Sequence, residues 1–529
     1  MDDIHLEALR KSEIIRAIQE LVPPGSPEPH EQIVIRKLQG LTRQLIQAYK
    51  ANGFLSKYPF ADGLLRRIHL YESEVKDRLK DKVVLVSGGK GCLGSAMVEK
   101  LVSLRAKRVI SLDKAGCNKE RSWQAGSDQR PSVVNYKVDV RDYKTMNAVF
   151  ETEKPEIVFH LAAQRLPWLA ELQIRETVTS NVFGTRNVIQ LCREHGVQQC
   201  VYSSTGKASR YLTSDVYAAS KKVCEWLFAH GARQGNVQYG MVRFTHMIEN
   251  SSCCQQFDDK IAQNRIVNVH SPHRYVVGQN ISEALHLLLN ALVLSQAGAI
   301  KFLVCRNLCW PEETLEVALY KILQSGKDLP IYFQGVIPGY EEPFFRGELD
   351  WDKPAEVHSL INAVENQSRI VDASGDILTA EAAPFSFSLL YKHLSNLENL
   401  TSDPDIPEIE IKQELSAMVK EITRSMFERT APDLLWKIIK WGTDSRHLKI
   451  QDTGIEAYKD VLKVLFEGLY EALNRKNSDC NPHQIPEKQR LPKEEVEDFL
   501  SYLEKTSPMV SCQFASIISM LPTFSPDYL

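Results

Sequence analysis

Two side chains four residues apart, Tyr217 and Lys221, have the spacing of a proton-transfer pair. Four residues make about one helical turn, so the phenol and the ammonium share a face of the predicted helix. An ammonium beside a phenol favours the phenolate and lowers its pKa, which gives a base able to remove a hydroxyl proton. Because Y-x-x-x-K also arises by chance on surface helices, this interpretation needs supporting context.

That context comes from two other segments. Ser203, Ser204 and Thr205 close an apolar run shortly before the pair, which places hydroxyl groups at the end of a predicted strand. Earlier, a β-branched run breaks into spaced glycines, VVLVSGGKGCLG, and then resumes with helical periodicity. The glycines with G-x-x-G-x-x-G spacing, which is typical of a turn whose amides approach a pyrophosphate at a helix start, are Gly88, Gly91 and Gly94.

The strand after this turn ends in Asp113, about twenty residues beyond the glycines. A carboxylate there accepts hydrogen bonds from a ribose diol, so we predict a dinucleotide as the first ligand. Asp113 favours the free diol of NAD, whereas Lys114 and Lys90 are placed to meet the 2′-phosphate of NADP. The cofactor is therefore NAD or NADP, with a lean to NAD.

The composition of the chain limits its other functions. Its 529 residues are too many for a single hydrophobic core, so we expect more than one domain. A net charge of −3 gives no indication of a nucleic-acid-binding surface. The 11 cysteines form no CxxC, and Cys305 and Cys309 fall in an apolar run, so we interpret them as core thiols and expect no metal. No apolar run predicts a membrane span and no signal peptide opens the chain, so we expect a cytoplasmic protein.

Three regions position these groups. Residues 1–80 predict an appendage of helices, and residues 354–529 are again mostly helical. Residues 81–353 alternate β-branched runs with amphipathic segments, which predicts an α/β fold with a doubly wound Rossmann parallel sheet and a small substrate lobe mainly at about 244–353. The predicted strands are Lys82–Ser87, Arg108–Leu112, Val133–Val138, Ile157–Leu161, Gln199–Ser203 and Gln238–Arg243.

Several motifs, taken in order, resemble the extended short-chain dehydrogenase/reductase superfamily. Within it, the chain is similar to the polysaccharide-biosynthesis sugar-nucleotide dehydratases, typified by UDP-N-acetylglucosamine 4,6-dehydratases, over about residues 81–350. The motifs are SGGKGCLGS, VDVRD, IVFHLAAQ, SNVFGTRNV, SSTGKAS, YAASKKVCEW, VRFTHMIENS and HRYVVGQNISEAL.

This resemblance implies a catalytic triad of Thr205, Tyr217 and Lys221, and an adenine site at Asp139 and Val140. It also implies that the segment 160–163 lines the cofactor. Together with the residues of the glycine turn and the strand end after it, the complete predicted cofactor set is Gly88, Gly91, Cys92, Leu93, Gly94, Asp113, Lys114, Asp139, Val140, Leu161, Ala162, Ala163, Asn181, Tyr217 and Lys221. The family's reaction oxidises C4 of the sugar, removes the C5 proton, expels the C6 hydroxyl and returns the hydride to C6.

The chain departs from this pattern where the family eliminates water and grips its substrate. The family's Thr-Asp-Lys triplet reads TGK, so the base position survives as Lys207 while Gly206 stands at the acid position. The later R-P-G-E-K element has Ile337 at its arginine, which removes a charge-assisted contact to phosphate. The remaining candidates for substrate contact are Arg165, Arg243 and Arg274 as anion ligands, and His246 as a proton donor or a structural histidine.

We therefore predict an NAD(P)-dependent enzyme that acts on a nucleotide sugar, or a similar polyhydroxylated small molecule, through a keto intermediate. A 4,6-dehydratase (a lyase) is the first candidate, followed by an epimerase (an isomerase) or a net oxidoreductase, since epimerisation needs no leaving-group acid. A natural-product tailoring enzyme and a cofactor-bound scaffold are alternatives of other classes, although the intact triad argues against a scaffold. We expect a homo-oligomer, and the terminal helices suit docking of a protein partner.

Overall fold

A nine-stranded sheet forms the centre of this computed structural model, which describes residues 2–115, 132–340, 343–450, 453–475, 491–519, 521 and 523–524. Its strands are β1 (Val83–Ser87), β2 (Arg108–Asp113), β3 (Ser132–Lys137), β4 (Ile157–His160), β5 (Gln199–Thr205), β6 (Gln238–Phe244), β11 (Lys301–Cys305), β14 (Ile370–Val371) and β15 (Ile377–Glu381). In space they follow the order β14-β15-β11-β6-β5-β4-β1-β2-β3, and the seven from β11 to β3 are parallel.

The six strands predicted from β-branched runs are confirmed, with ends that shift by one or two residues. Successive side chains along β1 point to opposite faces of the sheet, and both faces are buried. Val84 and Val86 belong to the hydrophobic cluster on one face, and Leu85 belongs to the cluster on the other face. The strand order reverses between β1 and β4, which is where a doubly wound sheet opens a crevice for a ligand. The predicted Rossmann architecture is confirmed.

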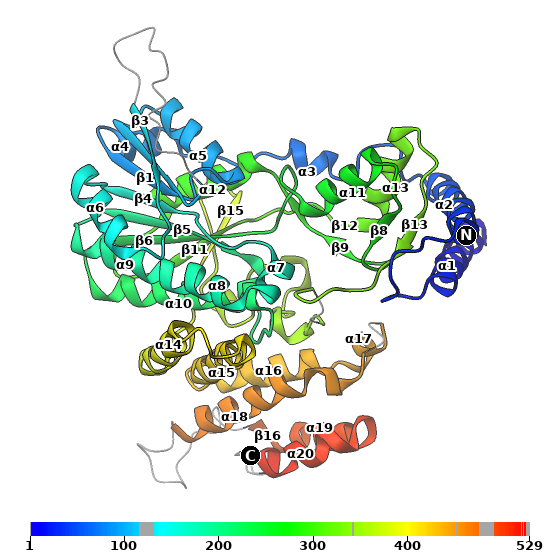
Figure 1. Cartoon of the computed structure of the whole chain (residues 1–529). Helices are drawn as coiled ribbons and strands as arrows, with labels where there is room; N and C mark the ends of the chain where they lie inside the picture. The colour runs from blue at the N-terminus through cyan, green and yellow to red at the C-terminus, as the bar shows by residue number, and fades with distance from the viewer. Residues whose placement is uncertain are drawn as a thin grey trace.

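Helices cover both faces of the sheet (Figure 1). One face carries α4 (Glu72–Leu79), α5 (Cys92–Ser103) and α12 (Ile281–Leu294), and the other carries α6 (Tyr143–Glu153), α9 (Gly184–Glu194) and α10 (Val216–Gln234). Between β4 and α9 the chain forms α7 (Pro167–Leu172), α8 (Ile174–Val178) and a π-helical turn, Thr179–Phe183. Since α4 packs against α12, the nucleotide fold includes the end of the region expected to be an appendage.

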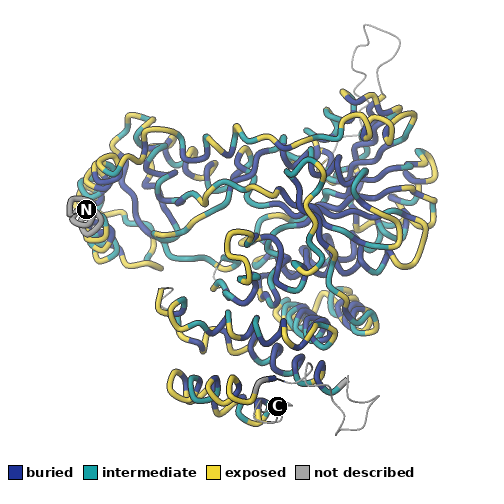
Figure 2. Tube along the Cα trace, turned by 180° about the vertical axis from the view of Figure 1, so that it is seen from behind, coloured by how far each residue is buried: buried dark blue, intermediate teal, exposed yellow. Residues whose placement is uncertain are grey.

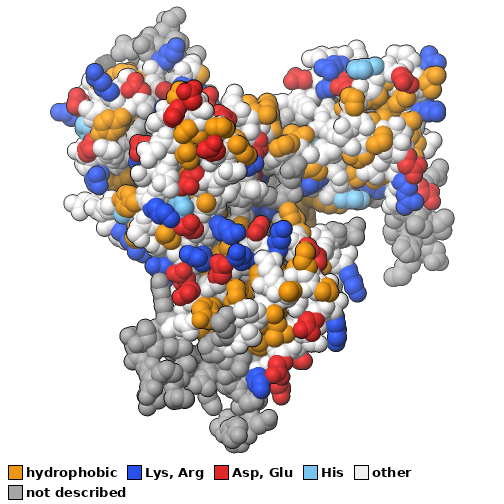
Figure 3. Space-filling model, turned by 60° about the horizontal axis from the view of Figure 1, so that its bottom comes forward, with side chains coloured by type: hydrophobic (Ala, Val, Ile, Leu, Met, Phe, Trp, Pro, Cys, Tyr) orange, Lys and Arg blue, Asp and Glu red, His pale blue; other side chains and the backbone are white. Residues whose placement is uncertain are grey.

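The smaller lobe contains the N-terminal helices and most of residues 246–333. Its elements are α1 (Asp2–Leu21), α2 (Gln32–Ala51), α3 (Ala61–Leu65), α11 (Ser252–Ala262), α13 (Thr314–Ser325), β7 (His246–Met247), β8 (Val267–Val269), β9 (Tyr275–Val276), β10 (Gly278–Gln279), β12 (Glu312–Glu313) and β13 (Ile331–Phe333). The helices α1 and α2 share a hydrophobic cluster with α13 and β13, so they belong to the lobe rather than standing apart. In Figure 3 this lobe projects from the main body, and acidic and basic side chains are interspersed on the visible face.

The C-terminal helices form further layers beneath the sheet (Figure 1). They are α14 (Phe387–Ser402), α15 (Glu408–Phe427), α16 (Pro432–Gly442), α17 (Ser445–Ile450), α18 (Lys459–Arg475), α19 (Lys493–Thr506) and α20 (Pro508–Ser519), with a short pair β16 (Leu491–Pro492) and β17 (Thr523–Phe524). Helix α15 packs on α10, and buried residues follow the central strands and the facing sides of the helices (Figure 2). Across the described ranges, no helix combines the length and the apolar character needed to cross a membrane.

The region expected to be helical after residue 354 also completes the sheet. Strand β15 pairs antiparallel with β11, and β14 pairs antiparallel with β15. The remaining short elements are 3₁₀ turns at Gly206–Ser209, Arg346–Glu348, Pro354–Glu356, Glu365–Ser368 and Ile455–Tyr458. These two strands form by pairing, β15 with β11 and β14 with β15, and a local sequence pattern does not reveal such pairing.

Candidate functional site

A cavity of about 1540 Å³ lies at the carboxyl ends of the parallel strands and extends into the smaller lobe. It is lined by most of the predicted cofactor residues, namely Gly88, Gly91, Cys92, Leu93, Gly94, Asp113, Lys114, Asp139, Val140, Leu161, Ala162, Ala163, Tyr217 and Lys221. The same cavity is lined by Thr205, Lys207, Arg165, His246 and Arg274. The structure therefore brings together residues that are nearly 190 positions apart in the chain, from Gly88 to Arg274.

The glycine-rich turn between β1 and α5 leaves no room for a side chain at Gly88 or Gly94. A Cβ on Gly94 would lie 2.0 Å from the carbonyl oxygen of Gly88. Gly88 has φ +71°, and a Cβ there would lie 2.8 Å from the backbone nitrogen of Ala162. Helix α5 begins at Cys92, so its first-turn amides border the cavity and have no partner within the helix. This cradle fits a pyrophosphate at a helix N-terminus.

Asp113 is fixed at the end of β2 by backbone amides. Its carboxylate accepts hydrogen bonds from the amides of Lys90 at 3.0 Å and Ala115 at 2.9 Å. The ammonium of Lys114 instead donates to Glu176 at 2.9 Å. The part of the cavity wall that would meet a ribose therefore presents the carboxylate of Asp113. Of the two lysines expected to meet a 2′-phosphate, Lys114 is already paired with Glu176.

Tyr217 and Lys221 lie in the first turns of α10, beside the end of β5. The hydroxyl of Thr205 hydrogen-bonds Tyr217, and the ammonium of Lys221 donates to the carbonyl of Ser203 at 2.6 Å. Burial raises the pKa of Tyr217 to about 12, against the effects of Thr205 and Arg165, and it lowers the pKa of Lys221 to about 8. The predicted lowering of the Tyr217 pKa by Lys221 is wrong here, because burial dominates and the ammonium bonds a carbonyl instead.

The ammonium of Lys207 is held in an ion pair that the sequence analysis missed. It donates to Asp215 Oδ2 at 2.5 Å and to the carbonyl of Gly339 at 2.8 Å. Asp215 is 3% exposed, and its other oxygen caps α10 by accepting from the amide of Ala218 at 3.1 Å. The available signal was an acidic residue at the N-cap position of the predicted helix, two residues before Tyr217.

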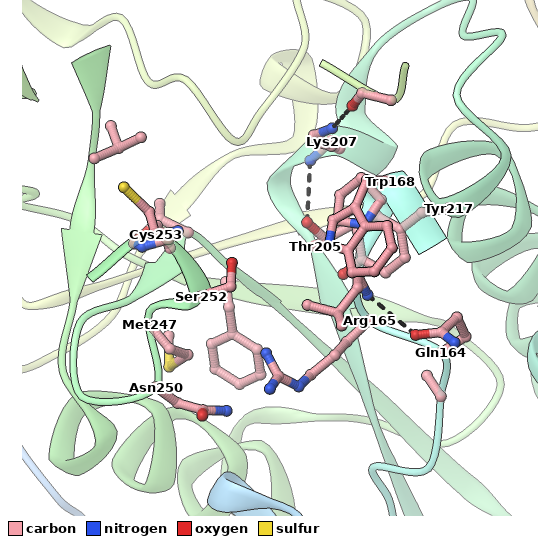
Figure 4. A pocket seen from close by; sticks show the side chains of 18 of the residues that line it. Gln164, Arg165, Trp168, Thr205, Lys207, Tyr217, Met247, Asn250, Ser252 and Cys253 are labelled. Carbon is pink, nitrogen blue, oxygen red and sulfur yellow. Dashed lines mark hydrogen bonds between the residues drawn. The ribbon is translucent and has the colours of Figure 1, made fainter. Parts of the chain in front are cut away.

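Figure 4 shows how the two walls of the cavity face each other. Thr205, Lys207 and Tyr217 lie on one side, and the segment with Met247, Asn250, Ser252 and Cys253 lies across from them. The side chain of Arg165 reaches into the space between the two walls. Burial raises the pKa of the Cys253 thiol to about 12, so this cysteine is not an activated nucleophile.

Packing disfavours a side chain at residue 206 unless Leu360 moves. A Cβ on Gly206 would lie 2.1 Å from the terminal carbon Cδ2 of Leu360. Leu360 is 5% exposed and comes from the segment between β13 and β14, beyond the residues where the substrate lobe was expected. The space next to the expected acid position is therefore filled by an apolar side chain, and Asp215 supplies the carboxylate that contacts Lys207.

The three arginines proposed as anion ligands have different environments. Arg165 and Arg274 line the cavity, and in the described part of the chain their guanidinium groups have no hydrogen-bond or ion-pair partner. Arg243 is 1% exposed and is paired with Glu225 and Glu365, each at 2.7 Å. The prediction that Arg243 contacts substrate is wrong, because two buried carboxylates enclose its charge and it does not line the cavity.

His246 lines the cavity and shares a hydrogen bond with the hydroxyl of Ser251 at 2.7 Å. Burial, followed by the charge of Arg165, lowers the pKa of His246, which favours its neutral form. A neutral imidazole tied to a serine is a poor proton donor, so the structural interpretation of His246 is the better one.

His160 and Asn181 lie behind the cavity wall rather than on it. The ring nitrogens of His160 hydrogen-bond the hydroxyls of Ser87 at 2.7 Å and Thr185 at 2.9 Å, and burial lowers its pKa to about 3. Asn181 accepts from the amide of Gln164 at 2.8 Å and is 1% exposed. The expectation that both line the cofactor is wrong, because each uses its polar atoms to join elements beneath the wall.

Residues 84–342 match a family model described as polysaccharide biosynthesis protein. The chain is 26% identical over 362 residues to the probable polysaccharide biosynthesis protein EpsC of Bacillus subtilis, covering 65% of this chain and 58% of that protein. It is also 26% identical over 185 residues to the UDP-N-acetylglucosamine 4,6-dehydratase (inverting) of Campylobacter jejuni, covering 34% of this chain and 53% of the relative. The chain thus spans only about half the length of these relatives, which are of the kinds that the motifs predicted.

Among solved structures, the chain resembles the UDP-glucose 4-epimerase of Thermus thermophilus in complex with NAD. The TM-score is 0.41 at 22% identity, and the match covers 48% of this chain and 86% of that one.

Proposed function

We propose that this chain, an extended short-chain dehydrogenase/reductase of the sugar-nucleotide dehydratase-like kind, modifies a nucleotide sugar with NAD(P) through oxidation at C4 and a keto intermediate. One observation carries the proposal: a single cavity runs from the glycine turn, past Thr205, Tyr217 and Lys221, to the unpaired Arg165 and Arg274. Such a cavity has room for a cofactor and an anionic second ligand. Matched relatives that are sugar-nucleotide enzymes support the same assignment.

The residues of the cofactor end fit a dinucleotide. The close approach of Gly94 to Gly88 admits a pyrophosphate to the helix start, and the amide-bound Asp113 suits a ribose diol. Because Lys114 is paired with Glu176, we favour NAD over NADP. When bound, the cofactor supplies the acceptor for a hydride from the substrate.

The residues of the chain supply the proton transfers. Tyr217, oriented by the hydroxyl of Thr205, takes the proton of the sugar hydroxyl that is oxidised. The resulting ketone at C4 makes the proton on C5 more acidic. In a 4,6-dehydratase, the Lys207–Asp215 pair would carry the proton from C5 to the departing C6 hydroxyl, which leaves as water.

A second candidate, a C4 or C5 epimerase, is favoured by the packing at residue 206. Leu360 fills the space beside Gly206, so no acid stands at the position that the dehydratase pattern requires. Epimerisation also proceeds through a keto intermediate but needs no leaving-group acid. The two candidates differ in whether the product has lost water.

The test is mass spectrometry of the full chain incubated with NAD or NADP and a panel of UDP-, GDP- and dTDP-sugars. Loss of water from one sugar identifies a dehydratase, and an isomer of unchanged mass identifies an epimerase. The Tyr217→Phe variant is the matched control and should give neither product. Wild-type protein that binds NAD(P) but alters no sugar in the panel would contradict a nucleotide-sugar substrate.

A further inference from the structure

We propose that the N-terminal hairpin, defined as α1, α2 and their connection, is part of the substrate site because two of its contacts position the cationic end of the cavity. The first contact holds the loop that carries Arg274, through Glu313. The second pairs Lys260 and Arg265 with a carboxylate, through Glu28. The inference rests on the proposed function in one respect, namely that this end of the cavity receives the phosphate-bearing part of the substrate.

Glu313 is the centre of the first contact. Its carboxylate is 5% exposed and lies where β12 meets α13. From the hairpin it accepts hydrogen bonds from the hydroxyl of Tyr49 at 2.5 Å and the ammonium of Lys11 at 3.2 Å. Burial, reinforced by Glu313, raises the pKa of Tyr49, so the phenol remains a donor. A buried carboxylate is costly without partners, and the hairpin supplies two of them.

The other oxygen of Glu313 holds the cavity loop. It accepts from the backbone amide of His273 at 3.0 Å, and His273 has φ +57°, which is unusual for a residue with a side chain. The carbonyl of the next residue, Arg274, accepts from the amide of Thr314 at 2.8 Å. Glu313 thus fixes the backbone from which the unpaired Arg274 enters the cavity.

The connection between the two hairpin helices makes the second contact. Glu28 accepts from Lys260 at 2.7 Å and pairs with Arg265 at 3.3 Å, and both of these cations line the cavity. Nearby, the amide of Gly25 donates to the carbonyl of Gln334 at 2.9 Å, and Gln334 also lines the cavity.

The two contacts have opposite electrostatic effects. The single carboxylate of Glu28 offsets part of the positive charge of Lys260 and Arg265, whereas Glu313 holds the Arg274 loop without pairing with its guanidinium. Of the lysines and arginines with which the described part of the lobe lines the cavity, Arg274 is thus the one without a carboxylate partner, and it is available to an anionic ligand.

The experiment is calorimetric titration of the full chain with UDP, and separately with NAD. Glu313→Gln should weaken UDP binding about tenfold, as expected when a charge-assisted contact loses its alignment. Tyr49→Phe should weaken it less, and Glu28→Gln should strengthen it by freeing two cations. The matched control is Arg43→Gln, because Arg43 joins the same hairpin to Asp328 through an exposed pair at 3.6 Å that does not border the cavity. NAD affinity should not change in any of these variants.

Amide hydrogen exchange over residues 273–277 and at Thr314 gives a readout that does not require UDP to bind. It should rise in Glu313→Gln and Tyr49→Phe but not in Arg43→Gln. If Tyr49→Phe folds and both exchange and UDP affinity match wild type, the inference is overturned. If wild-type protein does not bind UDP, the nucleotide part of the proposed function fails, and the exchange experiment still decides whether the hairpin holds the loop.

Discussion

The two ends of the cavity are built in different ways. At the cofactor end, local main-chain geometry sets the wall: a glycine turn, the first turn of α5 and side chains such as Asp113 at the ends of strands. At the substrate end, the wall is made of side chains held by contacts between distant segments, such as Tyr49 with Glu313 and Gly206 with Leu360. The comparison teaches that a wall built from local main-chain geometry leaves a motif in the sequence, whereas a wall held by contacts between distant segments leaves none.

The largest expected effect tests the backbone end. Gly94→Val should abolish binding of NAD(H), because even its Cβ would lie 2.0 Å from the carbonyl oxygen of Gly88. The measurement is titration with NADH followed by fluorescence. Gly40→Ala on α2, where nothing lies within 4 Å of an added Cβ, is the control and should bind NADH normally. Normal NADH binding by Gly94→Val would refute the cradle assignment.

This contrast explains how much of the molecule could be predicted. The strands and the glycine turn follow from local alternation and spacing, so they were placed within two residues, and most cofactor residues reach the cavity. Arg243 was misplaced because its burial depends on Glu225 and Glu365, the second of which is 122 residues away. The position of Leu360 beside Gly206 and the antiparallel strands β14 and β15 likewise depend on tertiary packing, which the periodicity of a local sequence does not reveal.

The next effect tests the chemistry where the two ends meet. Tyr217→Phe should lower the rate of substrate oxidation by about 10²–10⁴-fold and leave NAD affinity unchanged. Because burial raises the pKa of Tyr217 to about 12, the wild-type rate should increase with pH through the neutral range as the phenolate fraction grows. Cofactor absorbance measures the rate. Tyr340→Phe is the control, since burial also raises the pKa of Tyr340 to about 12, and phenylalanine keeps the ring that lies near the ammonium of Lys207 in the same cavity. An equal decrease in the oxidation rate of both variants would contradict the assignment of Tyr217 as the base.

A smaller effect separates dehydration from oxidation. Asp215→Asn keeps an N-cap acceptor for α10 but removes the negative charge beside Lys207, so elimination of water should slow by about tenfold or more while oxidation persists. Asp142→Asn is the control, because Asp142 caps α6 through the amide of Thr145, away from the cavity. Mass spectrometry of the product and cofactor absorbance report the two steps separately. Unchanged water loss in Asp215→Asn would exclude the Lys207–Asp215 pair from the elimination.

The smallest effect concerns residue 206, where the chain has a glycine in place of the family's acid and Leu360 fills the space beside it. Gly206→Asp should lower the free energy of unfolding by about 1–3 kcal/mol, because the new Cβ meets Leu360 at 2.1 Å. Leu360→Ala alone should also be destabilising, since it empties a buried site. The double variant should be more stable than the sum of the two single effects predicts, since the aspartate then occupies the space that the leucine leaves. Urea denaturation of the four proteins measures this coupling, and strict additivity would mean that Leu360 is not what keeps residue 206 a glycine.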